Sequence, residues 1–305
     1  MSGVREPNPQ RWPRWTAGPG AGGRYKQSPE DFEVDELPWC RPGTDGEHRW
    51  LLVEKIDYTT PEVADILARL CGVPRSEVGY AGLKDRAART RQVFTVPGQG
   101  GIGTLPTGIR LLESGRTRHK LRIGQLRGNR FRIRVNGGDP RIAQQRAALL
   151  SESGLPNYYG PQRLANDSAE RGYQLLLGEA RPGPIEETRF ALSAWQALQF
   201  NRVLAERGRA RLGGDLLEDG DPTGPMYGWS MQWPQGEALD LEERILNESG
   251  VPYDALNRFP ALTRGTRRPL WVPVAPRIEP DADGFWLHVR LPPGSYATVV
   301  LDELL

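Results

Sequence analysis

The sequence predicts an α+β protein, and three observations support this fold class. Apolar residues make up 38% of the 305-residue chain and charged residues 26%, with a mean hydropathy of −0.56, which is typical of soluble globular proteins. Segments with alternating apolar and polar residues predict strands, whereas capped segments with an apolar stripe predict helices. The length is sufficient for one large or two moderate domains.

The first expected elements are two short strands between residues 24 and 56, separated by the turn-rich stretch 41–47. A helix follows, for which Thr60 is a suitable N-cap, Pro61 suits the first helical position and Gly72 ends the helix. Its expected apolar stripe consists of Ile66, Leu67, Leu70 and Cys71.

The middle of the chain is expected to contain strands rich in basic residues. A brief buried strand at 78–81 leads into a loop at 82–86. Residues 120–124 and 131–135 alternate apolar and basic side chains, which predicts a β-hairpin with one cationic face. Asp139 and Pro140 then begin a helix that runs to about residue 150, and a break near residue 154 indicates a domain boundary.

The last third of the chain mixes helices, loops and strands. Helix-forming residues predict a helix over 186–207, which Gly208 ends, and a further helix over 239–249. Between them, residues 213–236 are rich in Gly, Pro and Asp and are expected to form loops. Near the C-terminus, residues 285–291 and 296–301 have the patterns of two strands.

Several classes of protein are excluded by what the sequence lacks. No apolar stretch is long enough to span a membrane, and residues 1–23 do not resemble a secretory signal, so a cytoplasmic protein is expected. Cys40 and Cys71 lie too far apart for a Cys-rich zinc site, and the three histidines have no ligand spacing, so we expect no metal. Motifs typical of nucleotide-binding enzymes, serine hydrolases and zinc peptidases do not occur.

Basic residues are concentrated in one part of the chain. Between Lys84 and Arg134 there are thirteen basic residues and only two acidic ones, although the whole chain has a net charge of +2. Such a block favours contact with nucleic acid, because Lys and Arg side chains neutralise phosphates. The alternative is a solvated strand face whose charges are balanced by acidic neighbours in the fold.

Asp85 is the carboxylate with the most unusual surroundings. Lys84 and Arg86 flank it, and Arg89 and Arg91 follow closely, so the carboxylate is expected to stay ionised. An ionised Asp can act as a nucleophile or a base. The alternative is that Asp85 only orients its basic neighbours in a surface cluster of ion pairs.

Five segments of the chain, taken together, resemble the motifs of the TruD family of tRNA pseudouridine synthases, and they occur in that family's order. The most specific is GYAGLKDRAARTRQ at residues 79–92. The others are KQSPEDFEVDE at 26–36, KLRIGQLRGNRF at 120–131, NYYGPQR at 157–163 and GSYAT at 294–298. The sequence departs from the family pattern at Leu164–Ala165, where Phe-Gly is usual.

The resemblance implies a pseudouridine synthase catalytic domain with a mixed, largely antiparallel sheet and helices. This domain is expected to comprise residues 1–153 and 271–305, and to be interrupted by an inserted α/β domain, the TRUD domain, at residues 154–270. The implied activity is isomerisation of uridine 13 in the D-arm of tRNA to pseudouridine. The reaction needs no cofactor, and the implied partner is tRNA. Separately from the resemblance, we expect the protein to be a monomer.

The resemblance also implies roles for individual residues. Asp85 falls on the catalytic aspartate and Lys26 on the basic residue that pairs with it. The positions that surround the flipped target nucleotide are Phe32, Asn129, Phe131 and Tyr296, and the expected RNA contacts are Lys84, Arg86, Arg127 and Arg130. Each assignment has an alternative: the two phenylalanines could be core residues, Asn129 a turn residue and Tyr296 a strand-edge aromatic.

Two questions about function stay open at this level. Asp85 could attack the sugar or base to form a covalent intermediate, or remove a ribose proton to form a glycal. Two other kinds of protein also fit the residues: an RNA-binding protein without turnover, and a hydrolase in which Asp85 attacks a nucleotide bond.

Overall fold

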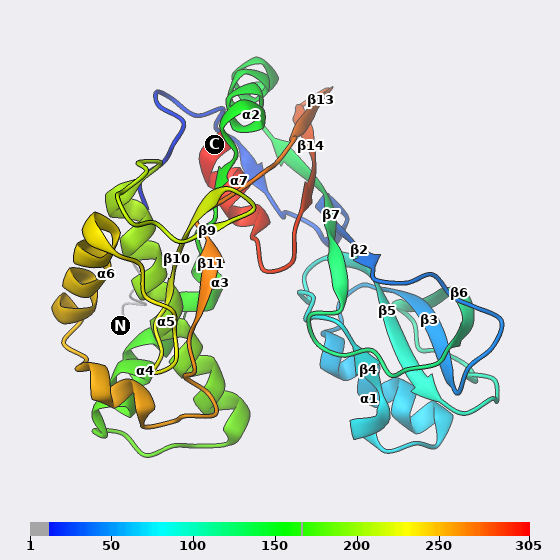
Figure 1. Ribbon diagram of the computed structural model, residues 1–305. Helices are drawn as coiled ribbons and strands as arrows, with labels where there is room; N and C mark the ends of the chain where they lie inside the picture. Colours follow the sequence, from blue (N-terminus) through cyan, green and yellow to red (C-terminus); the bar gives the residue numbers. More distant parts are fainter. Residues whose placement is uncertain (1–11, 166) are drawn as a thin grey trace, which may run out of the picture. The chain divides into compact units, whose positions relative to one another are not determined.

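The computed structural model describes residues 12–165 and 167–305 (Figure 1). Residues 1–11, part of the segment 1–23 that is expected not to be a secretory signal, lie outside the described residues. The chain divides into two compact units. We call them the sheet unit, comprising Gly18–Glu152, Val274–Ala297 and Leu304–Leu305, and the helical unit, comprising the described residues up to Ala17, Ser153–Pro273 and Thr298–Glu303.

A nine-stranded sheet forms the centre of the sheet unit, in the order β13-β14-β7-β2-β5-β3-β6, with β1 paired to β7 and β4 to β5. The pairing of β2 with β5 is parallel and the other pairings are antiparallel. The strands are β1 Arg24–Tyr25, β2 Phe32–Pro38, β3 His48–Lys55, β4 Gly79–Tyr80, β5 Arg89–Pro97, β6 Ile109–Thr117, β7 Leu126–Asn136, β13 Arg277–Asp281 and β14 Gly284–Leu291. The predicted α+β class, with a mixed and largely antiparallel sheet, is confirmed.

Helix α1 (Thr60–Cys71) packs on this sheet through Val63 and Leu67, which meet buried residues of β3 and β5. The helix and its end at Gly72, which adopts φ +64°, are confirmed. Thr59, not Thr60, is the N-cap, because its hydroxyl accepts from the Glu62 amide while the Glu62 carboxylate accepts from the Thr59 amide. The predicted apolar stripe is only partly correct, since Leu67 is buried but Leu70 is 37% exposed.

The predicted β-hairpin at 120–135 is wrong. Residues 120–125 form a loop, and residues 126–136 form the single long strand β7, whose neighbours are β2 and β14. Non-local pairing therefore replaces the expected local partner. The helix predicted after Asp139 is confirmed as α2 (Pro140–Ser153), and an Asp139 side-chain oxygen accepts from the Arg141 amide.

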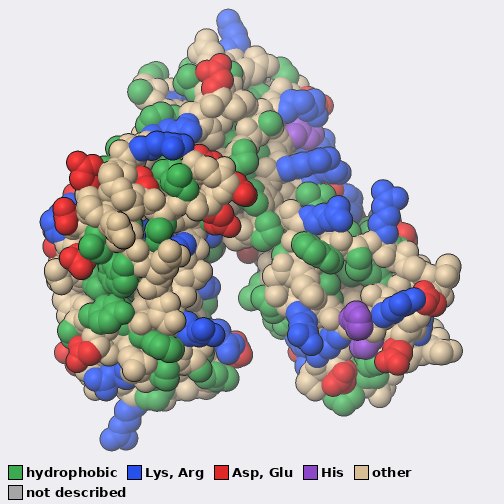
Figure 2. All heavy atoms as spheres, in the orientation of Figure 1, with side chains coloured by type: hydrophobic (Ala, Val, Ile, Leu, Met, Phe, Trp, Pro, Cys, Tyr) green, Lys and Arg blue, Asp and Glu red, His purple; other side chains and the backbone are tan. Residues whose placement is uncertain are grey.

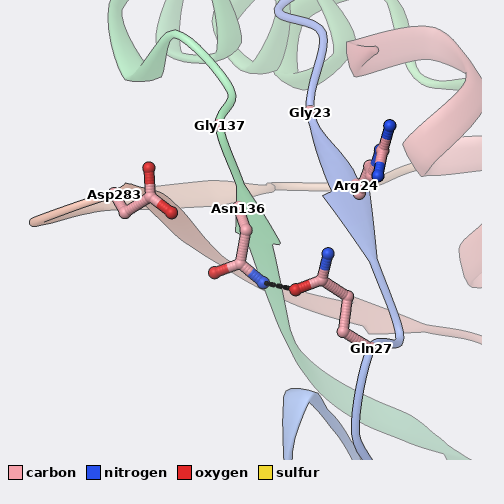
Figure 3. A pocket seen from close by; sticks show the side chains of 6 residues that line it. All are labelled: Gly23, Arg24, Gln27, Asn136, Gly137 and Asp283. Carbon is pink, nitrogen blue, oxygen red and sulfur yellow. Dashed lines mark hydrogen bonds between the residues drawn. The ribbon is translucent and has the colours of Figure 1, made fainter.

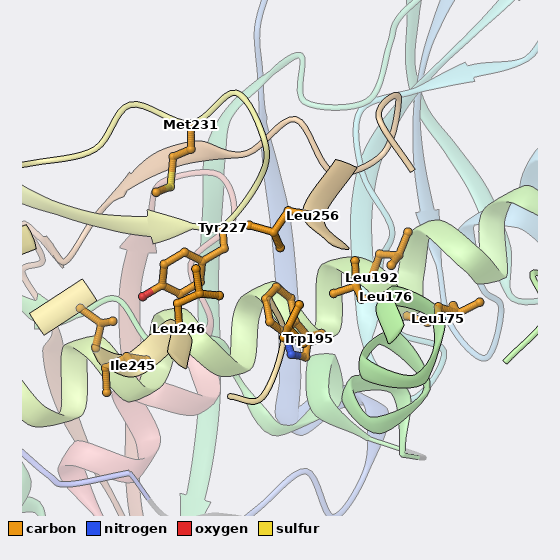
Figure 4. Packing of buried hydrophobic residues seen from close by; sticks show 12 residues of the cluster. Leu175, Leu176, Leu192, Trp195, Tyr227, Met231, Ile245, Leu246 and Leu256 are labelled. Carbon is orange, nitrogen blue, oxygen red and sulfur yellow. The ribbon is translucent and has the colours of Figure 1, made fainter. Parts of the chain in front are cut away.

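The helical unit is built around helix α5 (Ile185–Arg207), which confirms the helix predicted over 186–207. Its core joins α5 to α4 and α6 through large buried side chains that include Trp195, Tyr227 and Leu246 (Figure 4). The segment 213–236, expected to form loops, also contains two short strands. The remaining elements are β8 Leu155–Pro156, α3 Pro161–Leu164, α4 Ser168–Leu177, β9 Leu217–Glu218, β10 Asp221–Met226, α6 Gly236–Glu248, β11 Thr266–Pro269 and β12 Trp271–Val272; single-turn 3₁₀ helices lie at Pro29–Asp31, Arg75–Glu77 and Tyr253–Asn257.

The strand predicted over 296–301 is also wrong, because this segment begins helix α7 (Ala297–Leu304). Val299, Val300, Leu301 and Leu304 are all buried, so tertiary packing overrides the β propensity of the valines. The strand predicted over 285–291 is confirmed as β14. Within the residues that the structure describes, no helix is long and apolar enough to cross a membrane.

Candidate active site

Asp85 lies in the loop between β4 and β5, where its carboxylate Oδ2 is 3.0 Å from Nζ of Lys26. The two residues are 59 positions apart in the sequence. The Asp85 side chain is 55% exposed and the Lys26 side chain 31% exposed, so the carboxylate is held by a cation yet open to an approaching molecule. The geometry therefore brings together the two residues to which the sequence assigned the chemistry.

Lys26 adopts a backbone conformation that is uncommon for a residue with a side chain. Its φ of +60° is in the left-handed region, which costs an L-residue about 1–2 kcal/mol. The residues on both sides of Lys26 are held by β7: Tyr25 pairs with Val135, and the side-chain amide of Asn136 donates to Gln27 Oε1 at 3.0 Å. Strained backbone of this kind clusters at functional sites.

Figure 3 shows the pocket beside this segment. It is mostly polar, and none of the residues that line it was predicted as a site residue. The lining residues are Gly23, Arg24, Gln27, Asn136, Gly137 and Asp283. Through the Asn136–Gln27 bond, the pocket wall supports the strained turn at Lys26.

Phe32 and Phe131 lie together next to Lys26. Their ring centroids are 6.2 Å apart in an edge-to-face arrangement, and the Lys26 ammonium lies 5.0 Å from the centroid of the Phe32 ring. Phe32 is 5% exposed and Phe131 8% exposed. The two rings are thus packed mainly against the protein, as expected if they are core residues. They also form an apolar wall next to the Lys26–Asp85 pair.

Asn129 is on the same face of β7 as Phe131, because it lies two residues earlier in the strand. Its Oδ1 is buried and has no hydrogen-bond partner among the described residues. A buried acceptor without a donor requires an explanation, such as a ligand or water that completes the bond. Asn129 is paired with Leu291 at the end of β14, and Tyr296, which is half-buried, lies in the loop that follows this strand.

Lys84 and Arg86, both expected to contact RNA, have partners within the protein. Lys84 Nζ is 3.1 Å from Oε2 of Glu36, and the two side chains are 6% and 0% exposed. Arg86 pairs with Glu62 and also donates to the carbonyl oxygen of Asp57, while half of its side chain remains exposed. Lys84 is thus placed to hold the loop rather than to meet a ligand.

Eight of the thirteen basic residues between 84 and 134 form ion pairs. This agrees with the alternative in which acidic neighbours in the fold balance the charges of a strand face. Three of the thirteen are exposed and, among the described residues, have no hydrogen bond or ion pair from their side chains: Arg122, Arg127 and Arg130. Arg122 and Arg127 flank a turn that bonds to the Asp85 loop through the Gly124 amide and the Ala81 carbonyl, 2.8 Å apart.

Arg130 lies elsewhere, because successive strand residues point to opposite faces of the sheet and Asn129 and Phe131 occupy the Asp85 face. It shares the other face with Arg132 and Arg134 of β7 and faces Arg290 of β14. Figure 2 shows Lys and Arg side chains gathered around a histidine over β13, β14 and β7. The structure therefore does not bring Arg130 to Asp85.

Sequence reasoning missed the residues that hold the Asp85 loop from below. Thr60 Oγ1 accepts from the Lys84 amide at 2.9 Å, Gln92 Nε2 donates to the Gly82 carbonyl at 3.2 Å, and Lys55 Nζ donates to the Asp85 carbonyl at 2.9 Å. All three side chains are buried. No local sequence signal marks these residues, because their burial depends on how β3, β5 and α1 pack around the loop. Nowhere in the described residues do three His, Cys, Asp or Glu side chains form a group that could hold a metal.

A family model described as "tRNA pseudouridine synthase D (TruD)" matches residues 13–179 and 217–304, which is most of the chain. The chain belongs to the TruD family. The match leaves out residues 180–216, which include helix α5. The family predicted from five sequence motifs is thus confirmed.

Curated relatives of the TruD family align with almost the whole chain. A protein named tRNA pseudouridine synthase D from Anaeromyxobacter sp. is 40% identical, with 94% of this chain and 93% of the relative covered. One of the same name from Thermus thermophilus is 38% identical, with 97% and 93% covered. The crystal structure of a putative TruD from Methanosarcina mazei superposes with a TM-score of 0.70 at 21% identity, covering 97% of this chain and 95% of that one, which shows the shared fold.

Proposed function

We propose that this TruD-family protein isomerises uridine 13 in the D-arm of tRNA to pseudouridine, with Asp85 as the catalytic aspartate. The observation that carries the proposal is the 3.0 Å contact between Asp85 and Lys26 above the Phe32 ring. The relatives named tRNA pseudouridine synthase D support the reaction class.

The reaction rearranges bonds within one nucleotide. The bond from ribose C1′ to N1 of uracil breaks, the base turns and C1′ joins C5; the proton on C5 is then released, and N1 takes up a proton, so that no atom is gained or lost. Either role left open for Asp85, attack on the nucleotide or removal of a ribose proton, requires an ionised carboxylate at a fixed position. Lys26 supplies the fixed position, because its ammonium donates to Asp85 Oδ2 at 3.0 Å and so orients the carboxylate.

The target base must leave its stack to reach Asp85, which costs a few kcal/mol. In the proposal, Phe32 and Phe131 form the apolar wall against which the turned base lies, and Tyr296 closes the side next to β14. The unpartnered Oδ1 of Asn129 accepts from N3–H of uracil, which explains how a buried acceptor is satisfied when substrate is bound.

The proposal also assigns the rest of the molecule. The sheet unit performs the chemistry, while the helical unit, whose central segment Ser153–Pro273 spans 154–270, grips the folded tRNA by shape and phosphate contacts. Arg86 and Arg127 contact phosphates near Asp85, and any RNA contact of Arg130 lies on the other face of the sheet. We propose that the protein acts on tRNA in the cytoplasm, and that it does so as a monomer, since every predicted site residue near Asp85 comes from one unit of one chain.

Tritium release from tRNA labelled with 5-³H-uridine tests the activity. We expect release by the wild-type protein, loss of release by at least about 10³-fold in Asp85→Asn, and unchanged tRNA affinity. Asp65→Asn is the matched control and should keep full activity, because Asp65 is an exposed carboxylate on α1 that pairs with Arg75, away from Asp85. Absence of release from the wild type would indicate RNA binding without turnover, and a free base or cleaved RNA in mass analysis would indicate a hydrolase.

A further inference from the structure

Lys55, the last residue of β3, is a lysine with no exposed surface. Its ammonium donates to three main-chain carbonyl oxygens: Tyr58 at 2.6 Å, Asp85 at 2.9 Å and Lys84 at 3.5 Å. It forms no ion pair with any described residue, although burying an unpaired charge is costly. The protein therefore keeps a buried cation in contact with the Asp85 loop, at a cost in folding free energy.

The position of Lys55 in the sheet places it on the face of the candidate active site. Lys55 pairs with Thr90 of β5, and Thr90 pairs with Val34 of β2. Val34 points to the same side as Phe32, two residues earlier in the strand. Lys55 therefore approaches the Asp85 loop from the sheet, whereas Lys26 approaches its carboxylate from β1.

The contacts of Asp85 divide between these two lysines. Its carboxylate meets Lys26 and is 55% exposed, so few side-chain contacts limit its direction. Its main-chain carbonyl is bonded to Lys55, and the neighbouring Lys84 amide is bonded to Thr60. The position of the Asp85 main chain sets the direction in which its side chain points. The hydrogen bond from Lys55 to the Asp85 carbonyl therefore bears on the geometry of the carboxylate.

We propose that Lys55 is a positioning residue for Asp85: it clamps the Lys84 and Asp85 carbonyl groups to the end of β3 and so fixes the carboxylate where the reaction needs it. This inference rests on the proposed function. Lys55 does not take part in the chemistry itself, since its ammonium contacts main-chain oxygens and is closed off from solvent.

The charge state of Lys55 suits this role near neutral pH. Burial lowers its pKa to about 8 from an ordinary value of 10.5. Around it, Asp85 and Glu62 favour the charged form, while Lys84 and Arg86 oppose it. Below about pH 8 the side chain is therefore an ammonium, whose hydrogen bonds to carbonyl oxygens are about twice as strong as neutral ones.

The test compares Lys55→Met with a matched control on the same strand. Arg49 is also a buried cation of β3 that donates to main-chain carbonyls, those of Pro97, Gly100 and Gly101, but it lies roughly 20 Å further along the strand. Arg49→Met therefore removes a similar clamp away from Asp85. We measure kcat and KM for tritium release, and amide hydrogen exchange of the Lys84 N–H.

We expect Lys55→Met to lower kcat by about 100-fold, with KM for tRNA within twofold of the wild type, because a displacement of about 1 Å can cost that much. Exchange at Lys84 should be at least tenfold faster in Lys55→Met and unchanged in Arg49→Met. If Lys55→Met does not fold, Lys55→Gln, which keeps two donors, is measured in the same way and should lose less kcat.

Three results would overturn the inference: an unchanged kcat in Lys55→Met, an equal loss of kcat in Arg49→Met, or unchanged exchange at Lys84. The exchange measurement does not depend on turnover. A wild-type protein without tritium release would thus count against the proposed function, while Lys84 exchange would still decide whether Lys55 holds the loop.

Discussion

The buried ion pair between Glu36 and Lys84 should be essential for the stability of the sheet unit. Oε2 of Glu36 and Nζ of Lys84 are 3.1 Å apart, and both side chains are almost completely buried. The other carboxylate oxygen of Glu36 accepts from the Val93 amide at 3.2 Å. Removing one partner of such a pair leaves an uncompensated charge in the interior and costs about 3–5 kcal/mol.

We therefore expect Glu36→Gln and Lys84→Met each to lower the free energy of unfolding of the sheet unit by about 3–5 kcal/mol. The double variant should lose about 2–3 kcal/mol less than the sum of the single losses, because no unpaired charge remains. Native-state amide exchange of β5 measures this unit separately from the helical unit. Single variants within about 1 kcal/mol of the wild type, or strictly additive losses, would refute the reasoning.

Three further predictions concern the same region. Lys26→Met should lower kcat for tritium release by about 10–100-fold with tRNA affinity nearly unchanged, and an unaltered kcat would remove Lys26 from the site. Gly128→Ala should lower the free energy of unfolding by about 1–3 kcal/mol in urea titrations, because Gly128 has φ +135° and a Cβ there would lie 2.3 Å from the Leu291 carbonyl oxygen. The comparison is Gly124→Ala, since Gly124 also has a positive φ, +89°, but open space around it. Equal losses of stability in the two variants would contradict this account. Between pH 8 and 10.5 the unfolded chain holds a proton on Lys55 that the folded protein has lost. As the pH rises through this range, the free energy of unfolding of the wild type should therefore increase relative to that of Lys55→Met, by up to about 3 kcal/mol. Parallel curves of unfolding free energy against pH would show that the pKa of Lys55 is not lowered.

Local signals predicted the helices better than the strands. Helices α1, α2 and α5 were predictable because capping residues, prolines in the first turn and terminal glycines act within a few residues. Strand β7 was assigned a local hairpin partner, whereas its true partners, β2 and β14, lie about a hundred residues or more away in the sequence. The pairing of distant strands depends on the whole fold, which a local pattern does not contain.

The candidate site shows the same division. Asp85 and Lys26 could be chosen because the sequence resembles a family motif at both positions, and the structure brings their side chains together. Lys55 and Glu36 could not be chosen, because a lysine or glutamate near a strand end is usually exposed. Only the three-dimensional arrangement shows that both are buried beside the Asp85 loop.

Mapping of carbodiimide-reactive pseudouridines in tRNA incubated with the purified protein tests the central claim most directly. We expect one new pseudouridine at position 13 of the D-arm with the wild-type protein, and none with Asp85→Asn. Modification by the Asp85→Asn protein, or no new pseudouridine at position 13 with the wild type, would contradict the account.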